Sequence, residues 1–100
     1  MVPLQRIHSD ETYARGVPKL DLESWHKEST ETIIASLAPG EKKALRVKPD
    51  GRIINGNTRI KILIERGVNV NALPREILVE KGGMIYDHGN GYTIFFQAFA

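Results

Sequence analysis

The chain has 100 residues, of which 41% are hydrophobic and 26% charged, and it contains no cysteine. This length predicts a single domain with one core, and this composition excludes the low-hydrophobicity, high-charge profile of disordered chains. The absence of cysteine excludes disulfides, thiol nucleophiles and Cys-ligated metals, and it fits a reducing cytosol. The net charge of +2 is too small to indicate nucleic-acid binding by itself.

Residues 1–20 are expected to form an irregular arm, because Pro3, Pro18 and Gly16 interrupt any regular element there. The arm lacks the apolar run of a signal peptide. Apolar stretches elsewhere fall far short of the roughly 20 residues that cross a membrane. We therefore expect a cytoplasmic protein with no membrane partner.

Apolar residues then recur with a helical period within residues 22–38, up to the terminator Pro39-Gly40. The run Ser29-Thr30-Glu31-Thr32 is rich in helix-capping residues. The segment is thus either one helix or two helices with a break near Ser29. Trp25 lies on the apolar side, where core packing is the default role and base stacking the alternative.

Residues 45–48 alternate between apolar and basic side chains, which is typical of a half-buried strand. Pro49-Asp50-Gly51 has the residue types of a tight turn, and residues 52–54 return as a second strand. The pattern predicts a β-hairpin that leads directly into the next helix.

From Thr58 the apolar residues Ile60, Leu63 and Ile64 form a helical stripe that ends before Gly67. Ile62 lies outside this stripe, so we expect a second element to cover the helix on another side. The helix is predicted to be sandwiched.

Residues 75–79 are predicted to form a strand, and residues 84–100 a terminal hairpin with strands at 84–86 and 92–96. The apolar end of the chain could pair with a second copy, which gives a possible homodimer through the C-terminal strand. Together the elements predict an α+β fold with a small mixed sheet and packed helices.

The junction between the hairpin and the helix is the best candidate site. A helix N-terminus presents unpaired N–H groups and a partial positive charge, and Gly56 lets a ligand approach the backbone. Asn57 and Thr58 are good capping residues, whereas Arg59 in the first turn is unfavourable unless an anion is bound there. The simpler interpretation, a turn with a cap and an exposed arginine, stays open.

Other chemistry has weaker support. The three histidines, His8, His26 and His88, show no metal-ligand spacing, so we expect no metal site. Asp50 and Asp87 are best explained by turn formation, although either could serve as an acid, a base or a metal ligand. No catalytic residue can be named.

The order of elements and the run Gly56-Asn57-Thr58-Arg59 resemble the core of the ParB N-terminal-like domain, which sulfiredoxin shares in outline. The resemblance covers roughly residues 30–80 of the single domain. It implies a ParB/sulfiredoxin-like fold in which Gly56 and Arg59 contact a phosphate and Asn57 and Thr58 form the polar edge. Thr58 stands where ParB proteins usually have another arginine, and the chain has no counterpart of sulfiredoxin's catalytic cysteine.

The sequence thus favours a binding module for a phosphate-bearing ligand over an enzyme. The ligand is a nucleotide, with or without Mg, or a nucleic-acid backbone, and Asn55, Lys61 and Asp50 are expected to support the site. The first alternative is a nucleotide hydrolase or nuclease that uses the same cradle, with Asp50 or Asp87 near Arg59. The second is a protein–protein interaction module without a ligand.

Overall fold

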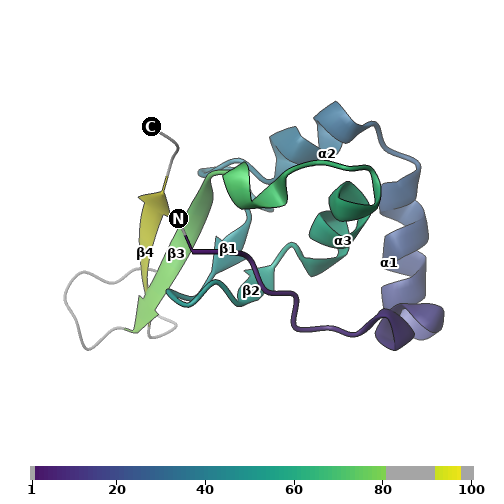
Figure 1. The fold of residues 1–100 in the computed structure, drawn as a ribbon, viewed down its shortest axis with the longest axis horizontal. Helices are drawn as coiled ribbons and strands as arrows, with labels where there is room; N and C mark the ends of the chain where they lie inside the picture. The colour runs from purple at the N-terminus through teal and green to yellow at the C-terminus, as the bar shows by residue number, and fades with distance from the viewer. Residues whose placement is uncertain (1, 81–91, 98–100) are drawn as a thin grey trace.

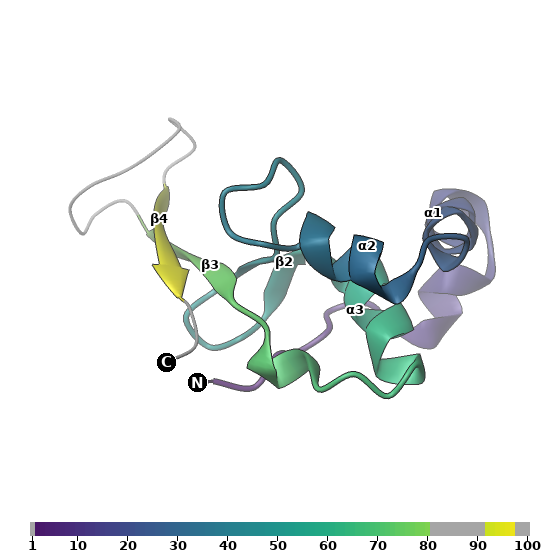
Figure 2. The same ribbon diagram turned by 90° about the horizontal axis from the view of Figure 1, so that it is seen from above.

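A computed structural model describes residues 2–80 and 92–97, and it confirms the predicted α+β class with a mixed sheet (Figure 1). The strands are β1 (Arg46–Val47), β2 (Ile53–Asn55), β3 (Arg75–Glu80) and β4 (Tyr92–Gln97). Their order in the sheet is β2-β1-β3-β4, with β1 parallel to β3 and the other neighbours antiparallel. The sheet forms one end of the molecule and the α-helices the other (Figure 2).

The helices differ from the prediction near the N-terminus. They are η1 (Asp10–Ala14), α1 (Gly16–His26), α2 (Thr30–Ser36), α3 (Asn57–Glu65) and η2 (Val70–Ala72). An irregular arm over residues 1–20 is therefore wrong from Asp10 onward. Gly16 follows the short turn η1 and begins α1, and Pro18 lies in the first helical turn, where its missing N–H costs no helical hydrogen bond.

The alternative with a break near Ser29 is correct, because Ser29 caps α2. Its hydroxyl oxygen accepts a hydrogen bond from the Thr32 N–H at 3.1 Å. Removal of such a cap typically costs about 1 kcal/mol. Ser29→Ala is expected to lower the free energy of unfolding by about this amount in urea denaturation, whereas Ser24→Ala, at an exposed position within α1, should change it by less than about 0.5 kcal/mol. Equal losses in both variants would contradict the capping role.

Helix α3 is sandwiched, as Ile62 predicted. Ile60, Ile62 and Leu63 have no exposed surface, and they belong to one core cluster against which Leu22 and Trp25 of α1 pack. Ile64, which the predicted stripe placed inside, is 48% exposed. The buried face is rotated toward Ile62 because α1 covers the side of α3 that an amphipathic surface helix would expose.

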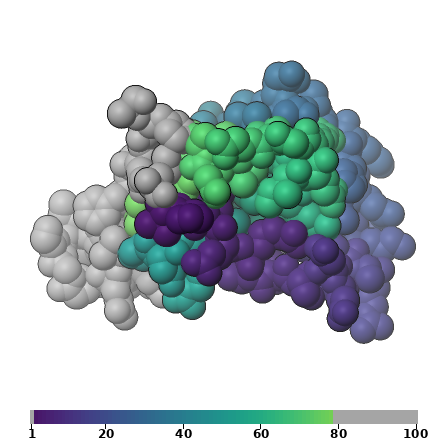
Figure 3. Space-filling view, viewed as in Figure 1, coloured from purple at the N-terminus to yellow at the C-terminus, as the bar shows by residue number. Residues whose placement is uncertain are grey.

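Residues 2–9, here called the N-terminal segment, are extended and lie across the hairpin (Figure 3). Gln5 forms a parallel bridge with Arg52: its N–H donates to the Gly51 carbonyl at 2.9 Å, and its own carbonyl accepts from the Ile53 N–H at 3.0 Å. Two further hydrogen bonds hold the segment to α3 and β3. The Ile7 N–H donates to Asn57 Oδ1, and Arg75 Nη1 donates to the Val2 carbonyl.

At the other terminus the predicted strand over residues 92–96 is present as β4, and it pairs with β3. The other half of the predicted terminal hairpin, residues 84–86 with the turn at 87–91, lies outside the described residues. Within the part of the chain that the structure describes, no helix has both the length and the apolar character needed to cross a membrane.

Candidate functional site

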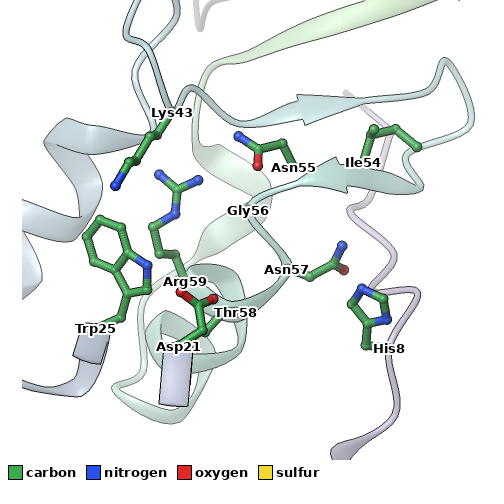
Figure 4. A pocket seen from close by; sticks show the side chains of 10 residues that line it. All are labelled: His8, Asp21, Trp25, Lys43, Ile54, Asn55, Gly56, Asn57, Thr58 and Arg59. Carbon is green, nitrogen blue, oxygen red and sulfur yellow. The ribbon is translucent and has the colours of Figure 1, made fainter. Parts of the chain in front are cut away.

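A pocket of about 360 Å³ lies at the start of α3, where β2 ends (Figure 4). The pocket contains the predicted site residues Asn55, Gly56, Asn57, Thr58 and Arg59. The remaining lining residues are His8, Asp21, Trp25, Lys43 and Ile54. The pocket thus combines the hairpin-to-helix junction with α1, the N-terminal segment and the loop before β1.

The backbone at this junction offers hydrogen-bond donors. Gly56 precedes α3 with a left-handed φ of 117°, and no side chain caps the helix. Among the described residues, the N–H groups of Asn57, Thr58 and Arg59 have no hydrogen-bond acceptor; the first helical bond runs from the Ile60 N–H to the Gly56 carbonyl. The positive end of the helix dipole adds to these donors, so the junction favours a negatively charged group.

Arg59 is the central side chain of the pocket. It is only 4% exposed, and its Nη1 donates to the Ser36 hydroxyl oxygen at 3.0 Å and to the Ser36 carbonyl at 3.3 Å. Its guanidinium carbon lies 5.0 Å from the centre of the Trp25 ring, within the range of a cation–π contact. No carboxylate of the described residues forms an ion pair with Arg59 within 4.0 Å.

Burial lowers the pKa of the Arg59 guanidinium, and the negative charge of Asp21 opposes this shift only in part. Arginine nevertheless keeps its charge in proteins. The site therefore holds a buried cation that lacks a close counter-ion among the described residues. A buried charge of this kind is costly, and a bound anion would reduce the cost.

The side chains of the other predicted residues already have partners. Asn57 accepts from the Ile7 N–H at 3.0 Å and donates to the Ile53 carbonyl at 2.9 Å. The Thr58 hydroxyl donates to the Tyr13 hydroxyl oxygen, and Asn55 donates to the Ala44 carbonyl. These side chains hold the walls of the pocket in place, so the donors that Asn57 and Thr58 offer to a ligand are their backbone N–H groups.

Two predicted supporting residues do not line the pocket. Lys61 donates to Glu65 at 2.7 Å and to Asp10 at 3.3 Å on the outer side of α3, and the hydrogen bond from Lys61 lowers the pKa of Glu65. Asp50 lies in the hairpin turn, where it accepts from the Arg52 N–H and from Arg52 Nε. Asp87, the other candidate acid, lies outside the described residues.

Five lining residues were not predicted as parts of this site: His8, Asp21, Trp25, Lys43 and Ile54. Asp21 and Trp25 are four residues apart and therefore lie on the same side of α1. That spacing could have linked them to each other, but no sequence pattern linked them to Arg59. Lys43 Nζ lies 5.4 Å from the centre of the Trp25 ring, so a second cation flanks the indole.

Among residues 2–80 and 92–97, which the structure describes, no group of three or more His, Asp or Glu side chains is placed to hold a metal ion. Comparison with known proteins gave no match: no family model, no curated protein and no solved structure matches this chain.

Proposed function

We propose that this protein is a small ParB-like binding module, cytoplasmic, for a phosphate-bearing ligand, which is either a nucleotide or a nucleic-acid backbone. The observation that carries the proposal is the buried Arg59 guanidinium, which has no acidic partner within ion-pair distance among the described residues. In Figure 4 this guanidinium points toward Gly56 and Lys43, beside the uncapped start of α3.

The chemistry of the pocket suits phosphate better than it suits a single-charged anion. Backbone N–H groups at a helix start, a planar guanidinium and a lysine ammonium together can serve the several oxygens of one phosphate. The Arg59 side chain retains donors beyond the Nη1 that binds Ser36. A phosphate would thus offset the desolvation of Arg59 and accept hydrogen bonds from the unpaired N–H groups in the first turn of α3.

The resemblance to the ParB N-terminal-like domain is part of the same proposal. Its support is the order of a helix, a β-hairpin, the Gly56-to-Arg59 run and a second helix, with a strand after it. In that interpretation Gly56 and Arg59 are the phosphate contacts.

Thermal unfolding with added nucleotides or short DNA, with and without magnesium, tests this function. A ligand at ten times its Kd is expected to stabilise the wild type by about 1.4 kcal/mol, which raises Tm by roughly 5–10 °C in a domain of this size. Arg59→Ala should remove most of this shift, measured against the variant's own Tm without ligand.

Arg52→Ala is the matched control, because Arg52 is an exposed arginine that pairs with Asp50 and does not line the pocket. It should keep the full ligand-induced shift. The proposal fails if no phosphate compound stabilises the wild type, or if Arg59→Ala responds as strongly as Arg52→Ala. Magnesium-dependent breakdown of the ligand would instead identify the hydrolase or nuclease alternative.

A further inference from the structure

Asp21 is a carboxylate on the wall of a pocket that otherwise favours anions. It lies in α1, and Figure 4 shows it close to Thr58 and Arg59 in that view. Its side chain forms no hydrogen bond or ion pair with another described residue. Its negative charge nevertheless acts on Arg59, where it raises the pKa of the guanidinium. The carboxylate oxygens are therefore available to a ligand.

The pocket is also larger than one phosphate requires. Its volume of about 360 Å³ falls in the range of pockets that hold small organic molecules. Trp25, Lys43 and Arg59 gather at one end, whereas His8 and Ile54 lie well away from them at the other (Figure 4). A phosphate bound at Arg59 leaves the rest of the pocket for an organic group attached to it.

A carboxylate beside a bound phosphate weakens binding, because the two negative charges repel each other. The binding is not weakened in this way if the ligand also brings a hydrogen-bond donor to the carboxylate. A ligand with a hydroxyl near its phosphate does so, and a hydrogen bond to a charged acceptor is stronger than one between neutral groups. In a DNA backbone the sugar hydroxyls are consumed by the phosphodiester bonds. DNA would therefore meet Asp21 with further negative charge and no hydroxyl donor.

We propose that Asp21 is a specificity-determining residue of this site, which selects a small phosphate monoester with a free hydroxyl and disfavours a DNA backbone. The inference rests on the proposed phosphate site and distinguishes a hydroxylated monoester, such as a nucleotide, from DNA. In this role Asp21 has opposite effects on two kinds of ligand. Its carboxylate repels a phosphate that brings no hydroxyl donor, and it accepts a hydrogen bond from one that does.

The test compares wild type with Asp21→Ala by isothermal titration at about pH 8, where a phosphate monoester is fully ionised and carries no P–OH. The ligands are methyl phosphate, ribose 5-phosphate and a short single-stranded oligodeoxynucleotide. Asp21→Ala should weaken ribose 5-phosphate binding by about tenfold or more, because a hydrogen bond to a charged group is lost. The same variant should bind methyl phosphate and the oligonucleotide a few-fold more tightly, because a nearby like charge is gone. Asp21 is exposed on a helix and alanine is a strong helix former, so the variant should fold.

Glu23→Ala is the control: Glu23 is also exposed on α1 and carries the same charge, but it does not line the pocket. It should change the three affinities little and all in one direction. If Asp21→Ala also shifts all three in one direction, Asp21 acts only as a general charge and the specificity role is overturned while the phosphate site stands. If the wild type binds none of the three probes, the phosphate site and the specificity role are both overturned.

Discussion

Gly56→Ala is expected to lower the free energy of unfolding by about 2–5 kcal/mol. Gly56 has a φ of 117°, where a residue with a Cβ is strained by about 1–2 kcal/mol. A Cβ there would also lie 3.2 Å from Leu37 Cδ2 and 3.2 Å from Leu45 Cδ1. Both leucines are fully buried, so they can give way only at the further cost of overpacking, roughly 1–3 kcal/mol.

Gly67→Ala separates strain from packing, because Gly67 also has a positive φ, 82°, but open space where its Cβ would lie. It should cost about 1 kcal/mol. Urea denaturation of both variants measures the difference. Equal costs would mean that the core around Leu37 and Leu45 does not constrain the junction.

The same substitution should weaken the anion site. The added Cβ would lie 3.8 Å from Arg59 Nη2 and would stand where a ligand approaches the backbone. Gly56→Ala is therefore expected to reduce the phosphate-induced Tm shift, while Gly67→Ala keeps it. A full shift in Gly56→Ala would show that the ligand does not approach α3 from the side of Gly56.

Local sequence patterns predicted the part of the fold in which neighbours along the chain determine structure. The alternation around Leu45, the Pro49-Asp50-Gly51 turn and the stop at Gly67 all lie within a few residues of what they specify. The observed strands, Arg46–Val47 and Ile53–Asn55, differ from the expected ones by a residue or two at their ends. Such boundaries depend on pairing partners, which local patterns do not contain.

The prediction failed where the determining contact is distant in sequence. Gly16 and Pro18 predict irregular structure by their usual preferences, yet α1 forms there and packs against α3. Ile64 fits the apolar stripe of α3 but is 48% exposed, whereas Ile62 is fully buried in the core cluster against which Leu22 and Trp25 of α1 pack. At Ile64 tertiary packing outweighs the local apolar pattern. At Pro18 the position in the first helical turn explains why the helix can form.

The residues of the candidate site also fall into two groups, those that local sequence patterns predict and those that only tertiary contacts bring to the site. Gly56 and Arg59 were recognisable because the chemistry of a helix start depends on consecutive residues. The other walls come from residues that meet only in the fold: His8, Asp21, Trp25 and Lys43. The donor to Asn57 Oδ1, Ile7, and the partner of the Thr58 hydroxyl, Tyr13, are likewise 50 and 45 positions away. Local spacing therefore locates the candidate anion site but does not determine its selectivity.

The second large expected loss of stability comes from substitution of Gly51, which lies against the N-terminal segment. Gly51 is buried with a φ of 96°, and a Cβ there would overlap the backbone carbonyl oxygen of Pro3. Gly51→Ala must therefore displace the segment or the hairpin turn. Displacement of the segment breaks its two backbone hydrogen bonds to the hairpin, and buried Arg75 loses its acceptor at Val2.

Backbone strain of about 1–2 kcal/mol and several hydrogen bonds worth about 1 kcal/mol each give an expected loss of about 3–5 kcal/mol. Hydrogen exchange should also accelerate at the amides of Gln5, Ile7 and Ile53, because their N–H groups form the hydrogen bonds that hold the N-terminal segment to the hairpin and to Asn57. Gly67→Ala again controls for strain, because its Cβ meets no atom within 4 Å. If Gly51→Ala loses no more stability than Gly67→Ala and leaves these three amides protected, the N-terminal segment is not clamped against the hairpin. His8 would then reach the pocket without support from the contacts around Gln5.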